Sequence, residues 1–187
     1  AGHFPHEPTS GQGQLIHAFS RFLFSPQPRC ALIVRGYAGT GKTTSIGAFV
    51  RALRELGAPT VLLAPTGRAA KVMQTYAGMS ASTIHREIYR SVRAKDGSTA
   101  YGLAPNLKER TIFIVDEASM IGESGGASDK GNFQYRSLLD DLMEYVFNGV
   151  DCRLVLVGDD AQLPPVGHPE SPALNEDRLR RDFALTV

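Results

Sequence analysis

The residues Gly36-Tyr-Ala-Gly-Thr-Gly-Lys-Thr43 fit the phosphate-binding pattern G-x-x-x-x-G-K-[ST]. In such a loop the glycines let backbone N–H groups surround the phosphates, and the following helix points its positive end at them. Lys42 would reach the β- and γ-phosphates, and the Thr43 hydroxyl would ligate Mg²⁺. The apolar run Ala31–Val34 precedes the loop and a helical pattern, Thr44–Leu56, follows it. Because the motif requires this strand–loop–helix context, we expect a nucleotide site rather than a glycine-rich turn.

Two acidic residues downstream could supply the rest of the chemistry. The β-branched run Thr111–Val115 ends directly at Asp116 and Glu117. At the carboxyl end of a strand in an open α/β sheet, such acids would lie beside the phosphate loop. Asp116 would hold Mg²⁺ through water, and Glu117 would orient and deprotonate the attacking water. Adjacent acids are also common at the start of a surface helix, but together with the Lys42 loop they predict a P-loop ATPase.

The elements that must position these groups alternate along the chain. Apolar strand candidates and helical patterns follow one another, which predicts a mostly parallel sheet with helices on both faces. The expected strands are Ala31–Arg35, Thr60–Ala64, Thr111–Val115, Arg153–Val157 and a fifth beginning at Ala184. The expected helices are Lys42–Leu56, Arg68–Ala77 and Tyr135–Phe147. One segment interrupts the alternation: Tyr89–Leu103 contains an Asp-Gly turn signal and predicts either a small hairpin or an irregular loop.

Composition indicates one globular domain over residues 1–187, with hydrophobic and charged fractions of 42% and 21%. No apolar run approaches the roughly 20 residues that a membrane span needs, so no membrane partner is expected. Cys30 and Cys152 each border an expected strand, and we interpret them as reduced core residues, which suits a cytoplasmic protein. The histidines and cysteines show no zinc-ligand spacing.

The net charge of +1 hides an asymmetry. Residues 68–110 contain eight Lys or Arg against three acids, and residues 116–160 contain ten acids against three bases. A basic segment beside an ATP site could contact nucleic-acid phosphates, and it could equally be an ordinary solvated face.

The expected strands end in polar signatures. Thr66-Gly67 follows one strand at a helix start, and Ser82-Thr83 stands at another helix start. In isolation these hydroxyls are best interpreted as helix N-caps, although the exposed N–H groups of such a helix start could also hold a phosphate. After the strand Arg153–Val157, Gln162 is placed where an amide could sense a γ-phosphate.

Taken in order, these signatures resemble the first motor domain of superfamily 1 DNA helicases, specifically the RecD-like branch with Dda-type enzymes and the exodeoxyribonuclease V alpha subunits. The resemblance runs from about Pro8 to the end of the chain. The matching segments are PTSGQ at 8–12, GYAGTGKTT at 36–44, APTGRAA at 64–70, STIH at 82–85, VDEASM at 115–120 and GDDAQLPPV at 158–166.

The resemblance implies a RecA-like P-loop fold and a role for each matching position. Gln12 would recognise the adenine edge, Thr43 and Asp116 would hold Mg²⁺, Glu117 would activate water and Gln162 would couple nucleotide state to domain closure. The triphosphate would be bound by Gly36, Ala38, Gly39, Thr40, Gly41, Lys42, Thr43 and Thr44. Single-stranded DNA would be contacted by Pro65, Thr66, Arg68, Thr83 and His85.

The resemblance further implies a 5′→3′ DNA helicase that couples hydrolysis of ATP, with Mg²⁺, to translocation on single-stranded DNA. The family's second motor domain, which supplies arginine fingers, is expected from the same polypeptide but is absent from this chain, so the isolated domain should be nearly inactive. A family strand-separating pin would here be reduced to residues 89–103. The resemblance leaves open a nuclease–helicase complex as partner. Two alternatives are a P-loop small-molecule kinase and a nucleotide-gated DNA-binding or assembly subunit without turnover.

Overall fold

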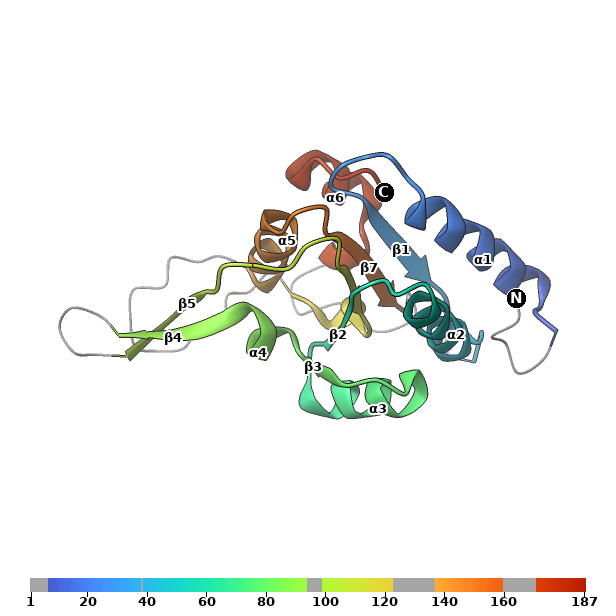
Figure 1. The fold of residues 1–187 in the computed structure, drawn as a ribbon, viewed down its shortest axis with the longest axis horizontal. Helices are drawn as coiled ribbons and strands as arrows, with labels where there is room; N and C mark the ends of the chain where they lie inside the picture. The colour runs from blue at the N-terminus through green and yellow to red at the C-terminus, as the bar shows by residue number, and fades with distance from the viewer. Residues whose placement is uncertain (1–6, 38, 94–98, 123–136, 160–170) are drawn as a thin grey trace.

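The computed structural model describes residues 7–37, 39–93, 99–122, 137–159 and 171–187. Five strands form one parallel sheet, whose spatial order is β1-β7-β6-β2-β3 (Figure 1). Their bounds are Ala31–Arg35 for β1, Thr60–Ala64 for β2, Ala81–Thr83 for β3, Ile112–Val115 for β6 and Arg153–Gly158 for β7. The expected α/β architecture with a mostly parallel sheet is confirmed.

The central strands bury both faces of this sheet. On β7, Leu154 and Leu156 belong to one core cluster, whereas Val155 and Val157 belong to the cluster on the opposite face. The four residues of β6, Ile112–Val115, alternate in the same way and are 3% exposed or less. Successive side chains of a strand point to opposite faces, so a continuous apolar run is what a doubly covered sheet requires.

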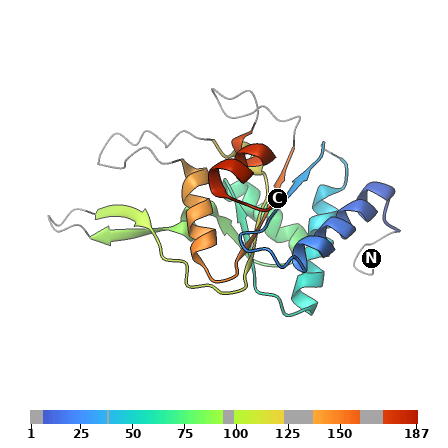
Figure 2. The ribbon, with the colours of Figure 1, turned by 90° about the horizontal axis from the view of Figure 1, so that it is seen from above.

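Helices cover both faces, as Figure 2 shows from above. The helices α1 (Ser10–Leu23), α2 (Lys42–Glu55) and α3 (Gly67–Ala77) contribute apolar side chains to one core cluster. The helices α4 (Ile84–Ile88), α5 (Leu138–Asn148) and α6 (Glu176–Phe183) contribute to the other. There are also two short 3₁₀ turns among the described residues. The turn η1 (Ala118–Met120) follows β6, and the turn η2 (Pro172–Leu174) follows β7 in the chain, with residues outside the described ranges between them.

The predicted strand at Ala184 is wrong. Ala184 has a left-handed φ of 52° and ends α6, and Thr186 forms only an isolated bridge with Cys30. The fifth strand is instead β3, which pairs with β2 from Leu62↔Ala81 to Ala64↔Thr83. The expected helix Tyr135–Phe147 begins later, at Leu138, because Ser137 and Asp140 form a capping box there. Residues 135 and 136 lie outside the described part of the chain.

Of the two alternatives left open for Tyr89–Leu103, a small hairpin or an irregular loop, the structure shows the hairpin strands. Strands β4 (Tyr89–Arg93) and β5 (Thr99–Leu103) pair antiparallel and extend away from the sheet (Figure 1). At its base, Tyr89 Oη donates a hydrogen bond of 2.6 Å to Asp141 Oδ2 on α5. The base of the hairpin is therefore fixed to the helical layer, whereas the residues of the Asp-Gly turn lie outside the described range.

Both cysteines are buried and free, as expected for core thiols. Among the described helices, none combines the length and apolar character that crossing a membrane would demand.

Candidate nucleotide-binding site

The candidate residues lie at the carboxyl edge of the sheet. The phosphate loop follows β1, Asp116 follows β6 and Asp159 follows β7, the strand between them. Register pairs Arg35 with Gly158 and Val115 with Leu156, so the three strands end at similar heights. Ligands of open α/β sheets bind outside such strand ends.

The loop after β1 has the backbone that the glycines were expected to allow. Gly39 and Gly41 adopt left-handed φ values of 81° and 82°. Gly41 is the N-cap of α2 and has no side chain that could accept a hydrogen bond. No side chain at this position therefore caps the first N–H groups of this helix. Thr40 Oγ1 donates to the Tyr37 carbonyl at 2.8 Å and is used within the loop. Ala38 lies outside the described residues.

The Lys42 ammonium lies inside the loop. Its Nζ donates to the Gly36 and Tyr37 carbonyl oxygens, the latter at 2.9 Å, and forms an ion pair of 3.5 Å with Asp159 Oδ2. The Lys42 and Asp159 side chains are 18% and 8% exposed. An incoming phosphate would therefore compete with Asp159 for the same cation.

The Gln12 side chain lies against this loop, although it comes from α1. Gln12 Oε1 accepts the Thr9 N–H at 3.0 Å, and Thr9 Oγ1 accepts the Gln12 N–H at 3.3 Å, which together form a capping box. A Cβ placed on Gly41 would lie 2.7 Å from Gln12 Nε2. The carboxamide is thus oriented by the helix cap, with its NH₂ group beside Gly41.

Replacing Gly41 by alanine should weaken MgATP binding by at least about tenfold, which corresponds to the loss of one N–H bond to a charged phosphate. The added Cβ meets Gln12 and strains a left-handed residue. Gly57→Ala is the matched control, since Gly57 also has a positive φ of 65° but nothing within 4 Å of the added atom. Isothermal titration of both variants checks this; equal losses of affinity would assign the effect to backbone strain alone.

Asp116 is held by two hydrogen bonds. Its Oδ1 accepts the Glu117 N–H at 2.9 Å, and its Oδ2 accepts the Tyr76 hydroxyl at 2.6 Å. Burial, followed by the negative charge of Asp116, raises the pKa of Tyr76 far above its usual value. Tyr76 is therefore a permanent donor to this carboxylate.

Glu117 has an unusual backbone. Its φ of 54° and ψ of 34° are left-handed, which is uncommon for a residue with a Cβ. Such strain persists where the surrounding structure fixes it, and it is frequent at functional sites. The turn η1 starts directly after Glu117.

The oxygen ligands fit a magnesium ion held mainly by a nucleotide. Mg²⁺ keeps several waters and uses one or two protein oxygens plus substrate phosphates. Thr43 is exposed at the first turn of α2, and Asp116 is half-buried at the end of β6. Within the described ranges, no group of three or more His, Cys, Asp or Glu side chains could hold a metal without such a ligand.

The predicted DNA contacts lie on the neighbouring strand ends. Thr66 follows β2 and caps α3, and Thr83 ends β3 and caps α4. Ala64 pairs with Thr83, so the two threonines belong to adjacent strand ends. Arg68 and His85 are exposed, and Pro65 is half-buried. The interpretation of the two threonines as N-caps is thus correct, and each hydroxyl, while accepting one N–H, still has its own proton to donate.

Two contributors were not predicted as parts of the site. Asp159 was visible only as part of a motif, and its ion pair with Lys42 follows from β7 lying beside β1. Tyr76 gave no local signal, because its partner is 40 positions away along the chain. Gln162, the predicted γ-phosphate sensor, lies outside the described residues.

Comparisons with known proteins show which families and proteins this chain is similar to. A family model described as an AAA domain matches residues 11–176. The chain is 34% identical over 138 residues to the ATP-dependent RecD2 DNA helicase of Deinococcus radiodurans, covering 72% of this chain. It is 28% identical over 143 residues to the ATP-dependent DNA helicase dda of Enterobacteria phage T4, covering 75% of this chain.

A solved structure extends the likeness to the fold. The Pif1 helicase from Candida albicans superimposes with a TM-score of 0.53 over 90% of this chain, at 22% identity. The chain spans 16% of the length of the RecD2 protein, 29% of the phage protein and 37% of the Pif1 chain. The chain belongs to the AAA-domain family and is a superfamily 1 helicase motor domain of the RecD-like type.

Proposed function

We propose that this domain binds and hydrolyses ATP within an ATP-dependent DNA helicase that translocates along single-stranded DNA, with 5′→3′ polarity. One observation carries the proposal: the phosphate loop, the Asp116–Glu117 pair and the two capping threonines Thr66 and Thr83 share one edge of the sheet. A single edge that presents both nucleotide and DNA groups is suited to couple them. The names of the relatives, RecD2 and dda helicases, support the same assignment.

In the proposed chemistry, Lys42 leaves Asp159 to contact the β- and γ-phosphates, and the N–H groups of the loop and of α2 surround them. Gln12 contacts the adenine. Glu117, whose backbone is left-handed at the turn after β6, orients and deprotonates the attacking water. Thr43 and Asp116 would hold Mg²⁺, which would neutralise phosphate charge. Gln162 and arginines of a second motor domain would complete the site.

Two alternatives have less support. A small-molecule kinase requires an acceptor pocket beside the γ-phosphate, whereas the edge next to Asp116 continues into exposed hydroxyl and basic groups at the starts of α3 and α4. A subunit without turnover would not need a general base, yet Lys42, Asp116 and Glu117 are all retained at the site. The hairpin β4–β5 would serve as a short strand-separating pin.

Binding of single-stranded DNA should be tolerant of sequence and sensitive to salt, because hydroxyls and basic side chains hold phosphates without reading base edges. Arg68→Ala in the full-length protein should reduce the slope of log affinity against log salt by about 0.7, the value for one contact to a single-strand phosphate. Fluorescence anisotropy with a labelled oligo-dT checks this.

Arg54→Ala provides the matched control for the DNA-binding experiment. Arg54 is an exposed arginine in the last turn of α2, at the opposite edge of the sheet from the DNA candidates. Its removal should leave the salt slope unchanged. Equal effects of the two substitutions, or a preference for one duplex sequence, would argue against the proposed DNA surface.

A further inference from the structure

The carboxylate of Asp116 is oriented in part by a side chain of the helix α3. Tyr76 lies in the last turn of α3, and its hydroxyl donates to Asp116 Oδ2 at 2.6 Å. This length is typical of an O–H bond to an ionised carboxylate. Since the other oxygen accepts the Glu117 N–H at 2.9 Å, both oxygens of Asp116 have fixed donors. The rotation of this carboxylate is therefore set by the position of α3.

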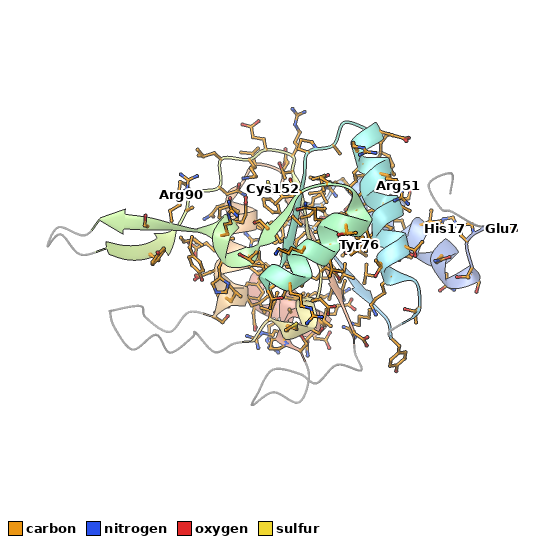
Figure 3. All side chains as sticks on the ribbon, turned by 90° about the horizontal axis from the view of Figure 1, so that it is seen from below. Glu7, His17, Arg51, Tyr76, Arg90 and Cys152 are labelled. Atoms are coloured by element: carbon orange, nitrogen blue, oxygen red, sulfur yellow. The ribbon has the colours of Figure 1, made fainter. Side chains whose placement is uncertain are left out.

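Tyr76 itself is held where α3 packs on α2 (Figure 3). A Cβ added to Gly47 of α2 would lie 3.1 Å from the Tyr76 carbonyl oxygen and 3.8 Å from its ring carbon Cδ2. The glycine lets the two backbones approach closely at this point. The helix α2 begins with Lys42 and Thr43, so the end of α3 that carries Tyr76 packs directly on the helix that carries the phosphate-binding side chains.

The other end of α3 lies at the proposed DNA surface. Thr66 caps the helix by accepting the Ala69 N–H at 3.2 Å, and Arg68 is exposed in the first turn. The helix has 11 residues, which at 1.5 Å per residue makes one short rigid element. A displacement of its first turn would be transmitted to Tyr76.

We infer that Tyr76 is a positioning residue, which orients Asp116 for MgATP and makes that orientation respond to DNA held at the first turn of α3. The inference rests on the proposed function. It adds a side chain that contacts neither nucleotide nor DNA and acts only through Asp116.

The first test separates magnesium from nucleotide. Tyr76→Phe in the full-length protein should raise the Mg²⁺ concentration at half-saturation of ATP binding by about tenfold, the lower end of the cost of removing a partner of a metal ligand. Binding of a fluorescent ATP analogue in EDTA should stay unchanged. A merely structural tyrosine would shift both titrations together, or neither.

Tyr145→Phe is the matched control for this titration. Tyr145 also donates its hydroxyl to a carboxylate, Glu87 Oε1 at 3.1 Å, but on the opposite face of the sheet. Its removal should leave the Mg²⁺ titration at the wild-type value. If Tyr76→Phe also matches the wild type, Tyr76 does not position Asp116 and the inference is overturned.

The second test measures coupling by a double-mutant cycle of Arg68→Ala and Tyr76→Phe, read as the ratio of ATP turnover with and without oligo-dT. Arg68→Ala should reduce this ratio in the wild type, and it should reduce it less when Tyr76 is already phenylalanine. We expect the two reductions to differ by a factor of at least about three, which is within the range for coupled residues. Multiplicative effects would overturn the coupling. A wild type that oligo-dT does not stimulate would instead refute the proposed function, so the two failures are distinguishable.

Discussion

Lys42→Ala in the full-length protein is expected to lower ATP turnover by about 10²–10³-fold, the range for removing one preorganised charge-stabilising donor. Lys42 is the cation that lies within the phosphate loop, held by two loop carbonyls and Asp159. Steady-state phosphate release at saturating MgATP measures the loss. Arg54→Ala removes a cation from the other end of the same helix and should leave turnover unchanged.

A second variant separates loss of the phosphate contact from loss of folding. Lys42→Ala removes a cation from Asp159, which is 8% exposed, and should therefore lower the melting temperature. Lys42→Ala combined with Asp159→Asn should restore much of that temperature while turnover stays low. Recovery of turnover together with stability would show that Lys42 serves the fold and not the nucleotide.

Glu117→Gln is expected to lower turnover by about 10²–10⁴-fold, the usual contribution of a general base. The amide keeps the size of the side chain and the left-handed backbone, so ATP binding should remain close to wild type. Single-turnover phosphate release and ATP binding are measured on the same preparation. Glu109→Gln, an exposed acid at the opposite edge of the sheet, is the control. A parallel loss of binding would mean that Glu117 does not act as the base.

In the five-stranded sheet, the sequence predicted the strands that are continuous apolar runs and missed β3. The bounds of β1 and β2 were predicted as observed. In a sheet covered on both faces, a strand is a continuous apolar run and not an alternation of apolar and polar residues, so its ends are easy to recognise. The strand β3 has three half-buried residues, and only its pairing with β2 makes it extended. Ala184, Leu185 and Val187 are apolar, but the left-handed backbone of Ala184 ends α6, and Thr186 then forms only an isolated bridge with Cys30.

The helix α1 shows what local signals could have added. Thr9 and Gln12 have the spacing of a capping box, and Phe19 and Phe22 repeat at helical spacing. The resemblance assigned Gln12 to adenine, whereas the structure shows its Oε1 also capping α1. Because Oε1 is used by the helix cap and Nε2 lies beside Gly41, Nε2 would be the atom that donates to the adenine in the proposed site.

Some features of the candidate site follow from the local sequence, whereas others depend on contacts between residues that are far apart in the chain. The phosphate loop is specified by eight successive residues, so its position and its left-handed glycines follow from the motif. The partners of Lys42 and Asp116 are set by strand order and by the packing of α3, which no local pattern contains. The left-handed backbone of Glu117 likewise results from the turn between β6 and η1 and not from its residue type.

The central claim, that one sheet edge couples ATP to single-stranded DNA, is tested most directly by steady-state phosphate release from the full-length protein. The reaction is run without DNA, with oligo-dT and with a blunt duplex of equal length. We predict that oligo-dT stimulates release, that the duplex does so less, and that Lys42→Ala removes the stimulation. Release that is equal under all three conditions, or transfer of the γ-phosphate to a small-molecule acceptor, would contradict the account.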